Sequence, residues 1–111
     1  MIYIDHWIAQ LKGVEFNTLK DKETLLNKAL TSAKKLKLTI VSSHVHEFKP
    51  HGLSLALIIA ESHFAIHTWP ELGYMHIDVF SCAQGSNLHQ LEKILVEQFS
   101  PEEIIVEKLE Y

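Results

Sequence analysis

The chain has 111 residues, of which 47% are hydrophobic and 22% are charged, a composition typical of one globular domain over residues 1–111. Its formal net charge is −4 and it contains no block of Lys and Arg residues, which argues against nucleic acid as a partner. The longest apolar run, residues 53–60, is far shorter than the roughly 20 residues of a membrane-spanning helix, so we expect no membrane span.

Two further features concern the cellular compartment. Residues 1–10 contain no basic stretch followed by a continuous apolar one, so we expect no secretory signal. The single cysteine, Cys82, excludes an internal disulfide and favours a reducing cytoplasm.

The first half of the chain has the pattern of a strand, a helix and a β-hairpin. Residues 2–11 alternate well enough for a strand, with Ile2, Ile4 and Ile8 on one side. Residues 20–36 have helical spacing of Leu25, Leu26, Ala29, Leu30, Ala33 and Leu36. Residues 38–48 and 52–60 are β-branched or apolar runs joined by the turn sequence KPHG, which indicates an antiparallel hairpin.

The second half predicts another strand pair, a helix and a last strand. Residues 63–69 and 74–82 form the pair, joined by PELG. A helix is expected to start at a Ser86 cap and to run to Phe99, and residues 103–111 read as a strand. This order indicates an α+β fold, a two-layer α/β sandwich with a mainly antiparallel sheet and two helices on one face. The other sheet face keeps many apolar residues, so we expect a homodimer that covers it.

The eight histidines raise the question of a metal site. His44 and His46 share one strand face, as do His63 and His67, so neighbouring strands could offer a pair of ligands. No HExxH or CxxC motif accompanies them, and we expect no metal. Cys82 could be a small buried hydrophobic residue or could pair with His67 in catalysis, and a lone cysteine does not decide between the two.

Glu61 and Ser62 follow directly after the apolar run. They could form an ordinary turn, but no helix follows that Ser62 could cap, and the GxSxG motif of a nucleophile elbow is absent. Phe48 and Trp69 would be core or interface residues in the absence of a ligand.

Three consecutive segments carry a family resemblance. They are SSHVHEFKPHGLSLALIIA (42–60), ESHFAIHTWPE (61–71) and GYMHIDVFSC (73–82). Together they resemble the short prokaryotic form of S-adenosylmethionine decarboxylase, a pyruvoyl-dependent enzyme of spermidine synthesis. The resemblance covers nearly the whole chain and is strongest from Val41 to Cys82.

The resemblance implies that the chain is a proenzyme that cleaves itself. The Ser62 hydroxyl would attack the Glu61 carbonyl, and the resulting ester would undergo β-elimination and hydrolysis, so that Ser62 becomes a pyruvoyl cofactor. The products would be a β chain, 1–61, and an α chain, 62–111. His67 matches the family's processing base, and Ser54 matches the hydroxyl that helps hold the ester.

The resemblance also implies roles in turnover. The pyruvoyl group would form a Schiff base with S-adenosylmethionine and act as an electron sink. Cys82 matches the proton donor, Glu71 the acceptor of hydrogen bonds from the ribose, and Phe48 the ring that stacks on adenine. Trp69 is a weaker candidate for the same pocket.

A distance argument bears on how these groups meet. Ser62 and His67 are five residues apart, which along a strand is about 16 Å, so they cannot touch within one chain. The family shares its active sites across a homodimer. The resemblance therefore implies a site in which one subunit contributes Ser54, His67, Phe48 and Glu71 and the other contributes Ser62 and Cys82.

The chain departs from the family pattern in its first strand and after Cys82. Ile4 replaces a glycine, Gln10 replaces an acidic residue, and SCAQGSN replaces the usual TCG. A glycine would allow close approach of a ligand, so these changes bear on the substrate pocket. Two alternatives stay open: a pyruvoyl-dependent arginine or ornithine decarboxylase of the same family, or an unprocessed non-catalytic paralogue acting as a regulatory partner.

Overall fold

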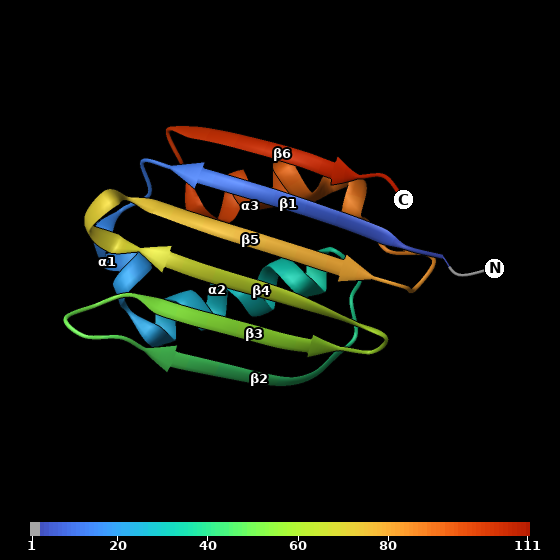
Figure 1. Ribbon diagram of the computed structural model, residues 1–111, viewed down its shortest axis with the longest axis horizontal. Coiled ribbons are helices and arrows are strands. Elements are labelled where there is room, and N and C mark those ends of the chain that lie inside the picture. The colour runs from blue at the N-terminus through green and yellow to red at the C-terminus, as the bar shows by residue number, and fades with distance from the viewer. Residues whose placement is uncertain (1–2) are drawn as a thin grey trace.

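The computed structural model describes residues 3–111 and contains one six-stranded antiparallel sheet (Figure 1). The strands lie in the order β2-β3-β4-β5-β1-β6. Their bounds are β1 (Asp5–Lys12), β2 (Ile40–Glu47), β3 (Leu53–Ile59), β4 (Ser62–Trp69), β5 (Tyr74–Ser81) and β6 (Glu103–Leu109). Every predicted strand is therefore confirmed. Residue Ile2 of the predicted first strand lies outside the described residues.

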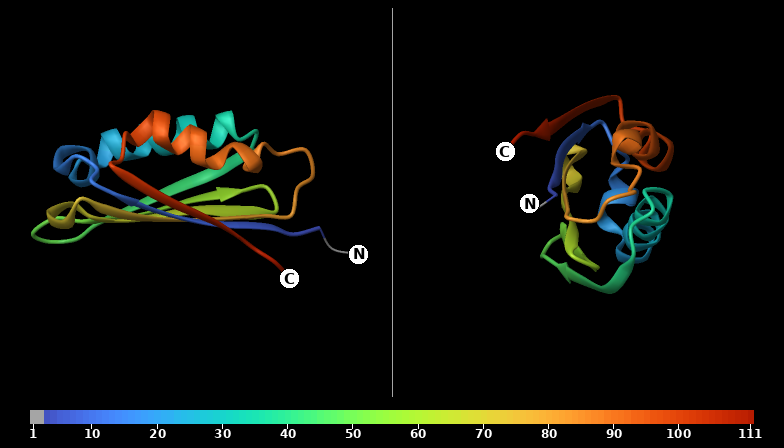
Figure 2. Two further views of the ribbon diagram at one scale, coloured as in Figure 1. Left: turned by 90° about the horizontal axis from the view of Figure 1, so that it is seen from above. Right: turned by 90° about the vertical axis from the view of Figure 1, so that its right-hand side faces the viewer.

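The helices cover one face of this sheet (Figure 2). They are α1 (Phe16–Lys20), α2 (Lys22–Lys35) and α3 (Leu91–Phe99), with short 3-10 turns at η1 (Pro70–Leu72) and η2 (Leu88–Gln90). The predicted two-layer α+β sandwich with two helices on one face is confirmed, and α1 is a short third helix that the sequence pattern did not indicate. Between residues 3 and 111, no helix is long and apolar enough to cross a membrane.

Helix α2 forms because its apolar stripe is buried and its first turn is capped. Leu25, Ala29 and Ala33 have no exposed surface. The Asp21 carboxylate accepts hydrogen bonds from the Thr24 hydroxyl (2.7 Å) and the Thr24 main-chain N–H (2.9 Å). These two bonds, the hydroxyl first, lower the pKa of Asp21 below its ordinary value of 3.8.

Helix α3 does not start where the sequence pattern indicated. The expected Ser86 cap is wrong: Gln90 occupies the N-cap position without a side-chain cap hydrogen bond, and η2 leads into the helix. The reason lies in tertiary contacts. The Asn87 main-chain N–H donates to the Leu36 carbonyl (2.8 Å), which ties this segment to the end of α2, and Leu88 is already buried. These contacts override the capping preference of Ser86.

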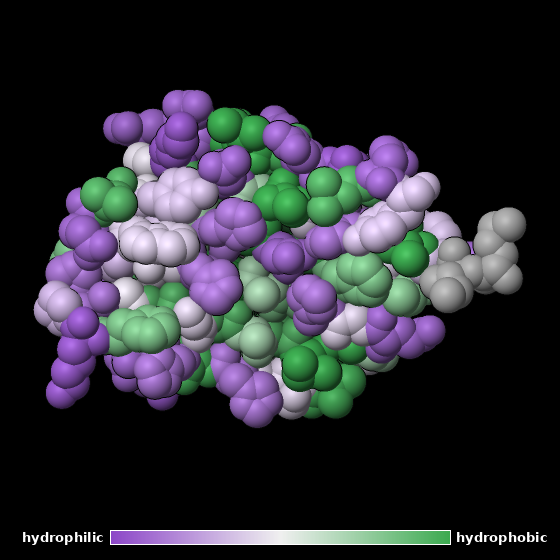
Figure 3. All heavy atoms as spheres, in the orientation of Figure 1, coloured by the Kyte–Doolittle hydropathy of each residue, from purple (hydrophilic) through white to green (hydrophobic). Residues whose placement is uncertain are grey.

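The uncovered sheet face, which we call the open face, mixes hydrophilic and hydrophobic side chains (Figure 3). Alternation, seen most clearly in β4 and β5, buries one set of residues under the helices and leaves the other set on this face. Six of the eight histidines belong to the open-face set: His6, His44, His46, His63, His67 and His76. Apolar members include Ala56, Ala65 and the exposed Ile58.

Candidate active site

The predicted site residues form two clusters at opposite ends of β4 (Figure 1). The first lies at the end of the strand, on the left of the figure beside α1. The second lies at its start, on the right, where β3 turns into β4. We call them the pocket cluster and the junction cluster.

The pocket cluster surrounds a cavity of about 320 Å³. Five residues that the sequence singled out line this cavity: Phe48, Ser54, His67, Trp69 and Glu71. The remaining lining residues are His51, Gly52, Leu53 and Thr68. The β2–β3 loop with the first residues of β3, and the last residues of β4 with turn η1, supply all of them, so two segments that neighbour each other across the sheet build one pocket.

Ser54 and His67 are direct partners across β3 and β4, and Ser54 Oγ lies 2.8 Å from His67 Nδ1. Both side chains point to the open face because Ile66 and Thr68, on either side of His67, are buried. When Nδ1 carries the proton of the neutral ring and donates to the Ser54 hydroxyl, Nε2 keeps a free lone pair. The His67 side chain is exposed, so Nε2 is accessible to another molecule.

Thr68 anchors the end of β4 on the helix-covered side of the sheet. Its hydroxyl is buried, donates to the Leu19 carbonyl in α1 (2.8 Å) and accepts from the Leu53 N–H at the start of β3 (3.0 Å). Removing this hydroxyl should destabilise the fold by more than the net energy of two hydrogen bonds, because two buried main-chain groups would be left without a partner. Thr68 thereby holds His67 and Trp69 in register with Ser54.

Turn η1 presents Glu71 to the pocket. Pro70 is buried at its first position and Gly73 ends it with φ +61°, a left-handed conformation that a side chain disfavours. A Cβ at Gly73 would also lie 3.2 Å from the Val14 carbonyl. The Glu71 carboxylate, half exposed, contacts His51 across the pocket, with 2.5 Å between Nε2 and Oε2.

The two aromatic rings of the pocket are not core residues. Phe48 is 51% exposed and meets His46 edge-on, with ring centroids 4.6 Å apart. Trp69 is 42% exposed and lies against Tyr74, whose hydroxyl donates to the Gln10 side chain (3.0 Å). Exposed rings beside a carboxylate in a cavity can stack on a flat heteroaromatic ligand and hydrogen-bond its polar groups.

The junction cluster comprises Glu61, Ser62 and Cys82. The Ser62 hydroxyl donates to the carbonyl oxygen of Glu61, the residue before it, and accepts from the Cys82 main-chain N–H (2.9 Å). Glu61 has φ +67°, which is costly for a residue with a side chain. The Ser62 Oγ thus lies against the carbonyl group of a strained peptide, and the partly exposed Cys82 thiol is on the neighbouring strand end.

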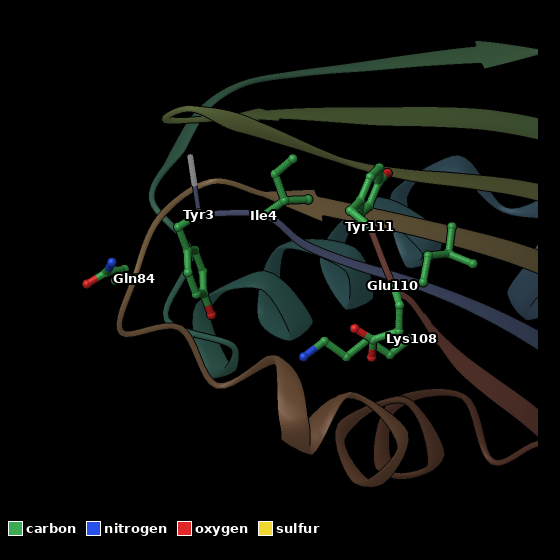
Figure 4. A pocket seen from close by; sticks show the side chains of 7 residues that line it. Tyr3, Ile4, Gln84, Lys108, Glu110 and Tyr111 are labelled. Carbon is green, nitrogen blue, oxygen red and sulfur yellow. The ribbon is translucent and has the colours of Figure 1, made fainter. Parts of the chain in front are cut away.

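A cavity of about 400 Å³ adjoins this end of the sheet (Figure 4). It lies between the N-terminal segment and the C-terminal end of β6, and Tyr3, Ile4 and Tyr111 line it. Ile4 is one of the departures from the family pattern, and its side chain occupies space that a glycine would leave open. On the open face nearby, His6 bonds Asp78 (2.8 Å) and Tyr111 (2.6 Å).

Among the pocket residues that the sequence pattern missed, His51 and Thr68 make polar side-chain contacts. Neither residue belongs to a catalytic motif. The only indication in the sequence is their closeness to predicted site residues, since His51 lies between Phe48 and Ser54 and Thr68 directly follows His67. Over residues 3–111, no three His, Cys, Asp or Glu side chains come together in the manner of a metal site.

Comparisons with known proteins identify the family. The family model for S-adenosylmethionine decarboxylase matches residues 5–110. S-adenosylmethionine decarboxylase proenzymes from Thermodesulfovibrio yellowstonii and Archaeoglobus fulgidus are 40% and 38% identical to the chain. The first alignment covers 85% of this chain and 70% of the relative, and the second covers 92% and 91%.

A solved structure agrees with these matches. The crystal structure of the adenosylmethionine decarboxylase of Aquifex aeolicus superposes with a TM-score of 0.87 at 30% identity, over 98% of this chain and 90% of that one. The resemblance noted in the sequence is confirmed across nearly the whole domain. The chain belongs to the S-adenosylmethionine decarboxylase family, as a proenzyme of its prokaryotic type.

Proposed function

We propose that the chain cleaves itself between Glu61 and Ser62 and that two copies complete each active site. The observation that carries the cleavage is the contact of the Ser62 hydroxyl with the Glu61 carbonyl group, at a residue with φ +67°. The nucleophile is therefore already beside the bond it must attack, and breaking that bond releases the strained conformation. The Cys82 N–H, 2.9 Å from Ser62 Oγ, holds the hydroxyl in place.

The proposed cleavage takes three steps: ester formation, β-elimination and hydrolysis. Ser62 Oγ bonds to the Glu61 carbonyl carbon while the peptide C–N bond breaks, which gives an ester and a free amine. A base removes the Ser62 α-proton and the Glu61 carboxylate leaves, so that position 62 becomes dehydroalanine. Water then releases ammonia and leaves a pyruvoyl group on the α chain, 62–111, and a β chain, 1–61.

The base of the second step is His67 of a partner subunit, with its ring oriented by Ser54. Within one chain His67 lies about 16 Å along β4 from Ser62, too far for proton transfer. The open face offers a surface on which a second copy can bind, and His67 is exposed on it. A homodimer with shared sites brings the pocket cluster of one subunit to the junction cluster of the other.

In turnover, the pyruvoyl group supplies an electron-withdrawing carbonyl that makes loss of carbon dioxide from S-adenosylmethionine favourable. The chain's own residues do the rest. Phe48 stacks on the adenine ring, with Trp69 beside it, and Glu71 accepts hydrogen bonds from the ribose hydroxyls. The Cys82 thiol delivers a proton to the former α-carbon of the substrate.

We assign the reaction to the cytoplasm, because the single cysteine forms no internal disulfide and a proton-donating thiol must stay reduced. The partners are S-adenosylmethionine and a second copy of the chain. The acidic net charge of −4 disfavours nucleic acid.

Intact-mass spectrometry of the purified protein tests the cleavage. We expect two chains that correspond to 1–61 and 62–111, the second with a blocked N-terminus, and one uncut chain for Ser62→Ala. Hydroxylamine should release extra cleaved product from any protein trapped as the ester. A single uncut chain for the wild type would support the non-catalytic paralogue. An amine-product assay with S-adenosylmethionine, arginine and ornithine then separates the decarboxylases, and activity on arginine or ornithine alone would overturn the substrate assignment.

A further inference from the structure

His51 lies in the β2–β3 loop, and two other elements contact its ring. Its Nε2 is 2.5 Å from Glu71 Oε2 on turn η1. Its ring meets the Phe16 ring of α1 edge-on, with centroids 5.1 Å apart. Only 27% of the His51 side chain is exposed, so the imidazole is held by packing and by the carboxylate together.

Glu71 needs such a partner to hold one conformation. Its side chain is 50% exposed, and the described residues offer it no Lys within ion-pair distance. A carboxylate has two oxygens with about four lone-pair sites, so one contact with His51 leaves enough acceptor capacity for two hydroxyl donors. A ribose diol presents two neighbouring hydroxyls, and accepting from both requires the carboxylate to keep a fixed plane.

We propose that His51 is a positioning residue that orients the Glu71 carboxylate and thereby determines how tightly the enzyme holds the ribose of its substrate. This inference rests on the proposed role of Glu71. The His51 N–H donates to Oε2 and fixes the side-chain torsions of Glu71, which leaves the second carboxylate oxygen able to accept from a ribose hydroxyl. Phe16 in turn fixes the plane of the imidazole.

The role differs from that of the processing residues in the same pocket. In the proposed mechanism, His67 and Ser54 act on the Glu61–Ser62 junction. Among the hydrogen bonds and ion pairs of residues 3–111, none joins His51 to His67 or to Ser54. Removing the imidazole should therefore leave self-cleavage intact and weaken binding of the nucleoside. A contact that merely holds the loop in shape would affect both.

The test compares His51→Leu, His51→Gln and the control His89→Leu, which removes an exposed histidine on η2. Processed protein is assayed with S-adenosylmethionine, and binding of 5′-methylthioadenosine, which carries the ribose without the amino acid, is measured by calorimetry. His51→Leu should raise KM and the nucleoside Kd about tenfold, which corresponds to about 1.4 kcal/mol of binding free energy. Its kcat should stay within about twofold of the wild-type value. His51→Gln, whose amide retains an N–H donor, should recover most of the loss, and His89→Leu should match the wild type.

A double-mutant cycle with Glu71→Gln separates positioning from a structural role. If His51 acts through Glu71, His51→Leu should change kcat/KM less than about twofold in the Glu71→Gln background. Equal losses in both backgrounds, an unchanged KM in His51→Leu, or failed self-cleavage in that variant would each overturn the inference. A wild type that neither cleaves itself nor decarboxylates S-adenosylmethionine would instead overturn the proposed function.

Discussion

Two inactive variants should restore each other if each active site is shared between subunits. Ser62→Ala removes the proposed nucleophile of the junction cluster, and His67→Ala removes the proposed base of the pocket cluster. Each variant alone should remain uncut. In a mixed dimer, the His67→Ala chain still carries Ser62 and the Ser62→Ala chain still carries His67, so one complete site is formed and one site lacks both groups.

The expected amount of cleavage follows from the geometry. Because Ser62 and His67 of one chain are about 16 Å apart, neither site in a dimer of identical variants is complete. With random pairing of equal amounts, about half of the dimers are mixed, and about half of the His67→Ala chains should therefore be cut. In mixed dimers isolated by two different tags, every His67→Ala chain should be cut and every Ser62→Ala chain should stay whole.

The assay is denaturing electrophoresis with intact-mass confirmation of co-expressed, differently tagged chains. Tandem affinity purification provides the mixed dimers, and the singly expressed variants serve as controls. Mixed dimers that remain uncut, or cutting of the Ser62-bearing chain when it is expressed alone as His67→Ala, would refute the shared-site geometry.

Three further outcomes are expected. Cys82→Ala should cleave itself normally but lose decarboxylation by about 100-fold or more, because only turnover needs the proton donor, and unchanged turnover would remove Cys82 from that role. Thr68→Val should lower the free energy of unfolding in urea by about 2 kcal/mol, since two buried main-chain groups lose their partner; wild-type stability would contradict the anchoring role. Asp21→Ala should lower the thermal midpoint at pH 7. Thr24 lowers the Asp21 pKa below 3.8, so the stabilisation by the ionised carboxylate is fully present above pH 3.8 and is lost as the pH falls through the lower folded pKa. The difference in thermal midpoint between Asp21→Ala and wild type should therefore shrink at low pH. A difference that stays constant with pH would argue against the cap.

Strand periodicity and turn residues predicted the sheet well. The alternation in residues 63–69 identified the strand, and the structure buries Phe64 and Ile66 while His67 is exposed, as alternation requires. The two apolar helical stripes were also sufficient to locate α2 and α3, since each has a continuous buried face.

Features that depend on tertiary contacts could not be predicted in the same way. Helix α1 has five residues, too few for helical periodicity, and is fixed by burial of Leu19 and by the hydrogen bond of its carbonyl with Thr68. The Ser86 cap failed because the Asn87 contact with the end of α2 joins residues 51 positions apart.

Within the site, the cross-strand pairing of Ser54 and His67 follows from hairpin register, but sequence alone did not show it, because a register slip of one residue would separate them. His51 escaped notice for a related reason. Its contact with Glu71 bridges two loops, and no local spacing rule covers such a pair.

The strand order has a consequence for the fate of the cut protein. Strands β1 to β3 precede residue 62 and β4 to β6 follow Glu61, yet β1 lies between β5 and β6 in the sheet. The two fragments of the proposed cleavage would therefore be interlaced, joined by the β3–β4, β5–β1 and β1–β6 ladders, and neither could depart without opening the sheet. Once unfolded, however, each cut domain would have to reassemble from two molecules, so the rate at which the domain itself refolds should depend on concentration, whereas the domain of uncut Ser62→Ala refolds from one chain. Self-cleavage would thus turn a reversible folding unit into one whose persistence depends on slow unfolding.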